Sequence, residues 1–163
     1  MRFLRTFLAA AVFFGPVAAA AAESPLIGTW KMQSYQREVV ATGARSNALD
    51  EHPTGYISYA PDGRMYAIFG PGNRAKPSGL TVTEKEAAEL HRTIVSYAGT
   101  YTIESDKKVV HHVDISWNQT FTGTEQVRFY VLKDDILTIT TPPCPGTAGG
   151  QESRYILVWK KVK

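Results

Sequence analysis

Alternating apolar and polar positions, the pattern typical of half-buried β-strands, dominate this chain. The alternation comes in short runs separated by turn residues, and it predicts strands at residues 26–40, 55–60, 64–69, 100–104, 109–116, 121–131, 136–141 and 153–162. Pro61, Asp62 and Gly63 predict a tight hairpin between two of them, because proline presets φ and glycine accepts a positive φ. About eight hairpin-linked strands indicate an all-β sandwich or a closed barrel.

One segment has the spacing of a helix. From Thr83 to Ala98, apolar residues recur every three or four positions, at Ala87, Leu90, Ile94 and Tyr97. Thr83 and Glu86 have the spacing of a capping box, which predicts the start of this helix. A single short helix among strands favours a lid or a plug over a helical core. The preceding segment, residues 70–79, is rich in glycine and proline and is expected to be a surface loop.

The first 22 residues have the pattern of an export signal. Arg2 and Arg5 precede an apolar stretch, and residues 20–22 are alanines followed by Glu23, as a signal peptidase requires. The apolar stretch is shorter than a membrane-spanning helix, so an uncleaved anchor is the weaker alternative. We expect a signal peptide over residues 1–22 and one mature domain over residues 23–163, exported to the periplasm or secreted, with no stable membrane insertion.

Composition excludes several classes of function. The chain has 18 basic and 15 acidic residues and a net charge of +3, and loss of Arg2 and Arg5 with the signal lowers that charge by two. No run of Lys or Arg suggests binding to nucleic acid. The single cysteine, Cys144, excludes an internal disulfide and a thiolate zinc site. Phosphate-binding, dinucleotide-binding and hydrolase motifs are lacking, so we expect no cofactor, no metal and no assignable catalytic residue.

A series of short motifs runs through nearly all of the mature domain, at residues 26–30, 55–59, 62–65, 97–101, 110–113, 123–124, 126–130, 137–143 and 157–159. In order and spacing these motifs resemble the lipocalin-like domains of bacteria and fungi, within the calycin group that includes the fatty-acid-binding proteins. The resemblance implies an eight-stranded up-and-down antiparallel barrel with one short helix, holding one small apolar or amphipathic ligand.

The resemblance also implies structural roles at the two ends of the chain. Gly28 and Trp30 on the first strand, and Trp159 on the last, are expected to be core residues, with Trp30 plugging the closed end of the barrel. In true lipocalins a late arginine packs over that tryptophan. Arg154 and Lys160 are the candidates for its counterpart here.

Two strands carry the candidate binding residues. Alternation over residues 109–116 groups His111 with Val109, Val113 and Ile115 on an inward face and turns His112 outward. An inward imidazole is open to three interpretations: a hydrogen-bond partner of the ligand, a base, or a satisfied core residue.

Residues 121–131 are ambiguous. Hydrophobicity sends Phe121, Val127 and Phe129 inside, whereas resemblance to fatty-acid-binding proteins suggests the reverse, with Arg128 and Tyr130 clamping a ligand carboxylate. The ligand-binding candidates are therefore Arg128, Tyr130, His111, Tyr66 and Gln126.

Three functions follow from this pattern. The first is an exported barrel that binds or carries a small hydrophobic or amphipathic molecule, with residues 70–79 and 83–98 guarding its mouth. The second is an isomerase or cyclase for a hydrophobic substrate, with His111 and Glu125 as acid and base if both face inward. The third is a ligand-free interaction module of the cell envelope, with a filled barrel and an exposed apolar patch.

Overall fold

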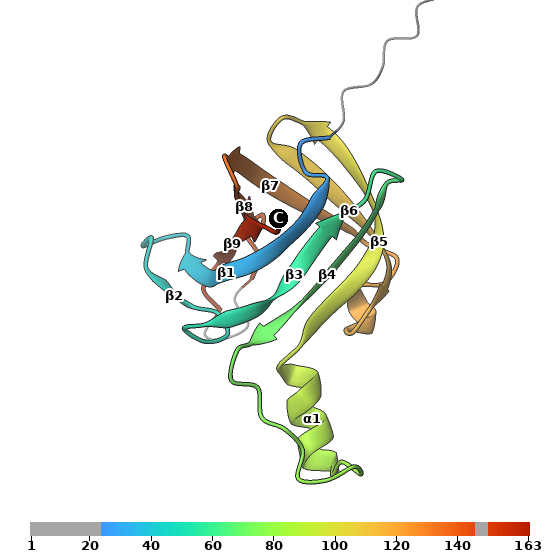
Figure 1. Ribbon diagram of the computed structural model, residues 1–163. Coiled ribbons are helices and arrows are strands. Elements are labelled where there is room, and N and C mark those ends of the chain that lie inside the picture. The colour runs from blue at the N-terminus through green and yellow to red at the C-terminus, as the bar shows by residue number, and fades with distance from the viewer. Residues whose placement is uncertain (1–23, 146–149) are drawn as a thin grey trace, which may run out of the picture.

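The computed structural model describes residues 24–145 and 150–163, and its strands form a closed barrel (Figure 1). The barrel strands are β1 (Gly28–Val39), β3 (Pro53–Tyr59), β4 (Arg64–Pro71), β5 (Val95–Ser105), β6 (Lys108–Ser116), β7 (Glu125–Lys133), β8 (Ile136–Thr140) and β9 (Ser153–Lys161). A short strand, β2 (Arg45–Asn47), pairs with the end of β1 outside the barrel. The predicted signal peptide lies outside the described residues and stays a prediction.

Strand β1 closes the barrel because it pairs on both of its edges. Its first residues pair with β3, and residues 30–39 pair with β9 across a register shift between Met32 and Ser34. Every other strand pairs with its neighbour along the chain, and all pairs are antiparallel. The predicted eight-stranded up-and-down antiparallel barrel is therefore confirmed.

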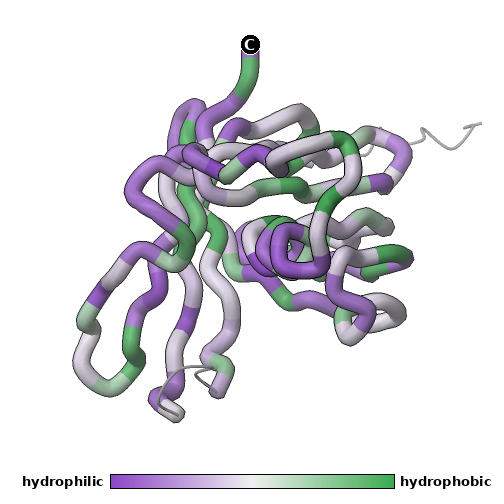
Figure 2. Tube along the Cα trace, turned by 90° about the horizontal axis from the view of Figure 1, so that it is seen from below, coloured by the Kyte–Doolittle hydropathy of each residue, from purple (hydrophilic) through white to green (hydrophobic). Residues whose placement is uncertain are grey.

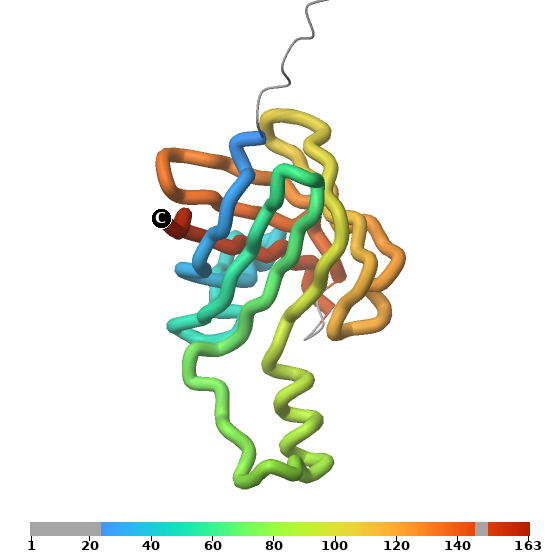
Figure 3. The backbone as a smooth tube through the Cα atoms, turned by 45° about the vertical axis from the view of Figure 1, so that its right-hand side comes forward, coloured from blue at the N-terminus to red at the C-terminus, as the bar shows by residue number. Residues whose placement is uncertain are grey.

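The two ends of the barrel differ in the length of the connections that join the strands. Tight turns join β3 to β4, β5 to β6 and β7 to β8 at the end where β1 starts, and Gly63 has a φ of 84° in the first of them. The longer connections lie at the opposite end. There an arm formed by residues 72–94 projects beyond the strands, as Figures 1 and 3 show.

Trp30 fills the closed end of the barrel. Its side chain is fully buried and its indole N–H donates to the carbonyl of Leu26 at 2.9 Å. The cation over its ring is Lys161, whose Nζ lies 5.0 Å from the ring centroid. Neither of the expected candidates takes this place: Arg154 pairs with Glu38, and the cation over the ring is Lys161 rather than Lys160. The side chain of Lys161 also lies where a Cβ at Gly28 would point, and Gly28 has a φ of +129°.

The helix is shorter than its apolar spacing predicts. The predicted capping box of Thr83 and Glu86 is present, but α1 spans only Glu84–Arg92. Of the remaining apolar positions, Ile94 lies between the helix and β5, and Tyr97 belongs to β5, where it pairs with β4. No residue of α1 is buried, and Figure 2, which views the molecule from the arm, shows the helix as mostly hydrophilic. The helix is therefore an exposed appendage of the barrel.

A register shift turns one expected inward residue outward. The pairing of β5 with β6 slips between Ala98 and Gly99, where the strands approach so closely that a Cβ on Gly99 would lie 1.9 Å from the carbonyl oxygen of His112. His111 and Val113 point into the barrel as predicted, whereas Ile115, beyond the shift, is exposed. The prediction for Ile115 is wrong because strict alternation fails at an irregularity.

Candidate functional site

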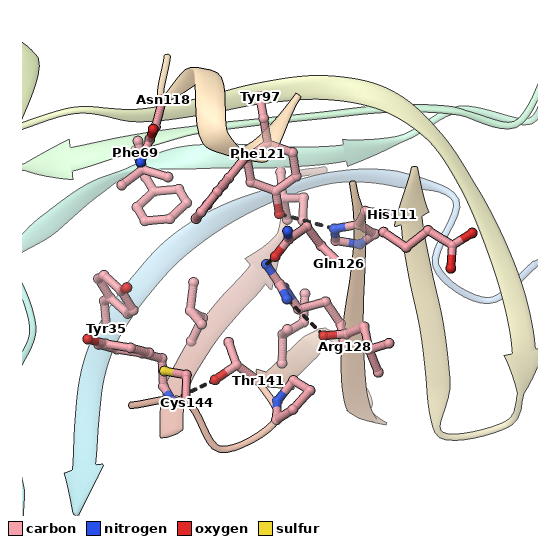
Figure 4. Close-up of a pocket in the computed structure, with 18 of the residues that line it drawn as sticks. Tyr35, Phe69, Tyr97, His111, Asn118, Phe121, Gln126, Arg128, Thr141 and Cys144 are labelled. Carbon is pink, nitrogen blue, oxygen red and sulfur yellow. Dashed lines mark hydrogen bonds between the residues drawn. The ribbon is translucent and has the colours of Figure 1, made fainter. Parts of the chain in front are cut away.

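A cavity of about 660 Å³ occupies the barrel towards the end with the long connections. Aromatic and aliphatic side chains from six of the barrel strands and from the connection between β6 and β7 form much of its wall: Tyr35, Ile57, Phe69, Val95, Tyr97, Trp117, Phe121, Ile139, Tyr155, Leu157 and Trp159. The polar side chains include His111, Gln126 and Arg128 (Figure 4). A lined space of this size fits one small, largely apolar molecule, and its presence argues against the filled-barrel alternative.

The orientation of β7 decides between the two sequence interpretations. Gln126 and Arg128 line the cavity and Tyr130 is buried, while Phe129 and Val131 are exposed on the outer surface. Simple hydrophobicity is therefore wrong for Phe129 and Val131, although Phe121 and Val127, which it also places inside, are among the lining residues. The guanidinium satisfies part of its hydrogen-bonding capacity locally, since it donates to the carbonyl of Val127 at 2.8 Å and to Oε1 of Gln126 at 3.2 Å.

Arg128 brings an uncompensated positive charge into the cavity. No carboxylate lies within 4.0 Å of it in the part of the chain that the structure describes. Burial raises the pKa of Tyr35 on the other side of the cavity, and the charge of Arg128 opposes this shift. A partly buried guanidinium without a counter-ion favours a ligand that carries a negative or strongly polarised oxygen.

Two of the candidate tyrosines lie elsewhere. Tyr130 faces inward, but it lies in the core beyond the cavity, and its hydroxyl donates to the carbonyl of Ser105 at 3.3 Å. Tyr66 is half exposed on the outer surface, beside Ile68 and Ile115. Alternation along β4 turns Tyr66 outward because Met65 and Ala67 take the core positions. The structure thus brings three of the five candidates together: His111, Gln126 and Arg128.

His111 lies between two tyrosine hydroxyls at the wall of the cavity. The Tyr59 hydroxyl is 2.8 Å from Nε2 and the Tyr97 hydroxyl is 3.0 Å from Nδ1, and the imidazole is fully buried. Burial, with a smaller contribution from the charge of Arg128, holds the pKa of His111 well below its usual value of 6.5. The imidazole is therefore neutral in the folded protein at neutral pH.

The second half of the expected acid–base pair is not beside His111. The Glu125 side chain is 73% exposed at the edge of the cavity, and its carboxylate lies 3.3 Å from Nδ1 of His112 on the outer face. An exposed carboxylate paired outside does not form the buried pair with His111 that catalysis would use. The geometry therefore gives no support to the isomerase or cyclase alternative.

Several cavity residues escape the sequence reasoning. Tyr97 was assigned to the helix, although Val95, Tyr97, Gly99 and Tyr101 alternate with small or polar residues in the period of a strand. Trp159 was expected to be a buried core residue, which it is, but it also lines the cavity. Its indole Nε1 is buried and has no hydrogen-bond partner among the described residues.

The mouth is formed by connections other than those expected. None of residues 70–79 and none of α1 lines the cavity. The lining instead includes Trp117, Asn118 and Phe121, at the short 3₁₀ helix η1 (Gln119–Phe121), and the segment Pro142–Pro145 before β9. This proline-rich segment is held by paired backbone hydrogen bonds between Cys144 and Ser153. Of the segments expected to guard the mouth, only Val95 and Tyr97 line the cavity, and both belong to β5.

Among the residues that the structure describes, no group of three or more His, Cys, Asp and Glu side chains has an arrangement that could hold a metal ion. No helix within the same residues has the length and apolar character needed to cross a membrane.

Comparison with known proteins agrees with this geometry. The family model of the lipocalin-like domain matches residues 27–162, which is almost the whole barrel. The chain belongs to the lipocalin-like family. This lipocalin-like protein is also 32% identical, over 90 residues, to a 4'-hydroxy-3'-methoxypropiophenone carrier protein of Aspergillus oryzae. The match covers 51% of this chain and 80% of that relative. The family and the cavity together indicate ligand binding within the barrel.

Proposed function

We propose that this lipocalin-like protein is an exported carrier of a small amphipathic molecule, which it encloses in the barrel cavity. The observation that carries the proposal is the cavity of about 660 Å³, with aromatic and aliphatic walls and the guanidinium of Arg128, which has no carboxylate partner within the described ranges. Burial of apolar ligand surface supplies about 25 cal/mol per Å², and the polar side chains set the orientation.

The ligand class that fits best is a small aromatic compound bearing oxygen substituents. The cavity wall is rich in aromatic rings, including Tyr35, Trp117 and Phe121. The name of the Aspergillus relative gives it an aryl ketone as cargo, and this ketone carries a hydroxyl and a methoxyl group on its ring. A molecule of this kind presents a flat apolar body to the rings and polarised oxygens to Arg128.

A titration with 4'-hydroxy-3'-methoxypropiophenone tests the proposal. Trp117 and Trp159 line the cavity, so ligand entry should quench the intrinsic fluorescence of the protein. The Val95→Trp variant fills part of the cavity, because Val95 is a half-buried lining residue. The matched control is Val131→Trp, which makes the same change at an exposed position on the outer face of β7.

We expect saturable binding by the parent protein and by Val131→Trp, and at least tenfold weaker binding by Val95→Trp. Equal binding by all three proteins would place the ligand outside the cavity. Absence of binding for this ketone and for other oxygenated aromatic compounds of similar size would contradict the carrier role. Export has its own test, because expression of the full chain should yield a periplasmic or secreted protein whose first residue is Glu23.

A further inference from the structure

The hydrogen bonds around His111 determine which of the two flanking tyrosines has a hydroxyl proton free for another partner. A neutral imidazole has one N–H donor and one bare nitrogen that accepts, so one of the two flanking tyrosines donates to the ring and the other accepts from it. The tyrosine that accepts keeps its own hydroxyl proton free for a third partner. Because His111 is neutral, one of the two tyrosine hydroxyls has a proton that no group in this network accepts.

The two tyrosines differ in what surrounds them. Tyr59 is 1% exposed, does not line the cavity, and its hydroxyl has His111 as its only hydrogen-bond partner among residues 24–145 and 150–163. If Tyr59 held the spare proton, a buried donor would be left without an acceptor, which costs free energy. Tyr97 lines the cavity, so a ligand can accept its proton. The favoured arrangement has Tyr59 donating to Nε2, Nδ1–H donating to Tyr97, and the hydroxyl of Tyr97 donating into the cavity.

Trp159 supplies a second free donor at the same cavity. Its side chain is fully buried, and its Nε1–H has no partner in the part of the chain that the structure describes. An indole nitrogen can only donate, and Trp159 lines the cavity, so a molecule held there can supply an acceptor. Around the ring of eight strands, β5 and β9 are four strands apart in either direction. Tyr97 and Trp159 therefore lie on opposite walls of the barrel.

We propose that the Tyr97 hydroxyl and the Trp159 indole N–H are the donors that orient the ligand, and that the ligand presents acceptor oxygens, such as ketone and ether oxygens, to these two walls. This inference rests on the proposed carrier function and names the chemistry of its cargo. Tyr59 acts as a positioning residue, because it directs the proton of Tyr97 through His111 without touching the cavity.

The state of His111 can be measured without any ligand. Nitrogen chemical shifts of isotopically labelled histidine distinguish a protonated ring nitrogen from a bare one, and comparison with His111→Gln assigns the signals. We expect His111 to carry its proton on Nδ1 at neutral pH. A proton on Nε2 would overturn the inference, because Tyr97 would then donate to His111 and have none for the ligand.

A pair of probes tests recognition of the acceptor oxygen. One is 4'-hydroxy-3'-methoxypropiophenone, and the other keeps its ring substituents but has a methylene group in place of the carbonyl. Tyr97→Phe and Trp159→Phe each remove one donor. Tyr101→Phe is the matched control, since its hydroxyl donates to the carbonyl of Ala60 and does not line the cavity.

The ratio of the two Kd values is the readout, because it cancels general effects on the cavity. We expect the removal of at least one donor to shift this ratio about fivefold towards the methylene probe, the size of one neutral hydrogen bond, and Tyr101→Phe to leave it unchanged. If both probes bind but neither Tyr97→Phe nor Trp159→Phe moves the ratio, the inference fails while the carrier function stands. If the parent protein binds neither probe and no related aromatic compound, the carrier function itself fails.

Discussion

The Tyr59 hydroxyl lies 2.8 Å from Nε2 of His111, inside a barrel wall where both side chains are shielded from water. Burial lowers the pKa of His111 well below 6.5 and raises the pKa of Tyr59 above its usual value of 10. Both groups are therefore held neutral. The pair is a polar contact inside an otherwise apolar core, and its protonation is tied to the stability of the fold.

Protonation of His111 should make the protein acid-sensitive at unusually mild pH. The unfolded chain binds a proton at His111 below pH 6.5, and the folded chain does not, so the free energy of unfolding falls as the pH drops below that value. One such group changes this free energy by at most about 1.4 kcal/mol per pH unit. Urea unfolding between pH ~7.5 and ~5 measures the slope. His111→Gln should reduce this pH dependence of the free energy of unfolding.

His112→Gln is the control for this slope, since His112 is partly exposed on the outer face. Hydrogen bonds hold the pKa values of the Glu38 and Glu86 carboxyls below 4.5. The stabilisation that these two carboxylates supply is therefore lost only when the pH falls below 4.5, outside the range of this experiment. A slope between pH ~7.5 and ~5 that is identical in the parent protein and His111→Gln would show that His111 is not kept neutral by the fold.

Arg128→Met should remove the preference of the cavity for negative charge. The substitution keeps an unbranched apolar side chain and removes the guanidinium. A charge-assisted hydrogen bond contributes about 1.5–3 kcal/mol, so binding of decanoate should weaken by roughly 10- to 100-fold while binding of decanol changes little. Calorimetry measures both affinities. Arg64→Met is the control, because Arg64 forms an exposed pair with Asp114. Equal losses for acid and alcohol would show that Arg128 acts through packing.

Cys144 should report whether the cavity is occupied. It is the single cysteine of the chain, it is partly exposed, and it lines the cavity beside Pro143 and Pro145. Its thiol donates only a weak hydrogen bond, at 3.4 Å, to the carbonyl of Ser153. Ligand in the cavity should therefore slow its reaction with a thiol reagent. An unchanged reaction rate at saturating ligand would place the bound molecule away from this segment.

Lys161 should stabilise the closed end of the barrel through Trp30. Its Nζ lies 5.0 Å from the centre of the indole ring, a cation–π distance. Lys161→Met keeps much of the side chain and removes the charge, so we expect a loss of about 0.5–1 kcal/mol. Trp30→Ala should cost about 3–5 kcal/mol, because it empties a fully buried site. Denaturant unfolding measures both. An unchanged free energy of unfolding in Lys161→Met would show that the contact with Trp30 does not stabilise the fold.

The fold is readable from the sequence because strand alternation and turn residues are local signals. The hairpin at residues 61–63 and the orientation of His111 and His112 follow from them directly. Tyr97 was misread because three- to four-residue spacing and alternation overlap in the same segment, and pairing with β4 decides between them. Ile115 was misread because a register shift carries no sequence signal of its own.

The site is less predictable, because it depends on contacts between distant strands. Arg128 lies inside despite its charge, which hydrophobicity alone does not predict and which resemblance to a ligand-binding family does. The sequence does not show that the indole N–H of Trp159 lacks a partner or that Tyr59 meets His111, since 52 positions separate the second pair. The sequence also does not show that η1 and the Cys144 segment line the same cavity, because the two come together only in the folded barrel.

The most direct test of the carrier function is mass spectrometry of an organic extract of the purified protein, compared with an extract of Val95→Trp. We expect one small aromatic, oxygen-bearing compound in near-stoichiometric amount from the parent protein, and a marked loss of it from the variant with the partly filled cavity. An empty extract from the parent protein, together with no uptake of 4'-hydroxy-3'-methoxypropiophenone or related compounds, would contradict the central claim that the barrel carries a ligand.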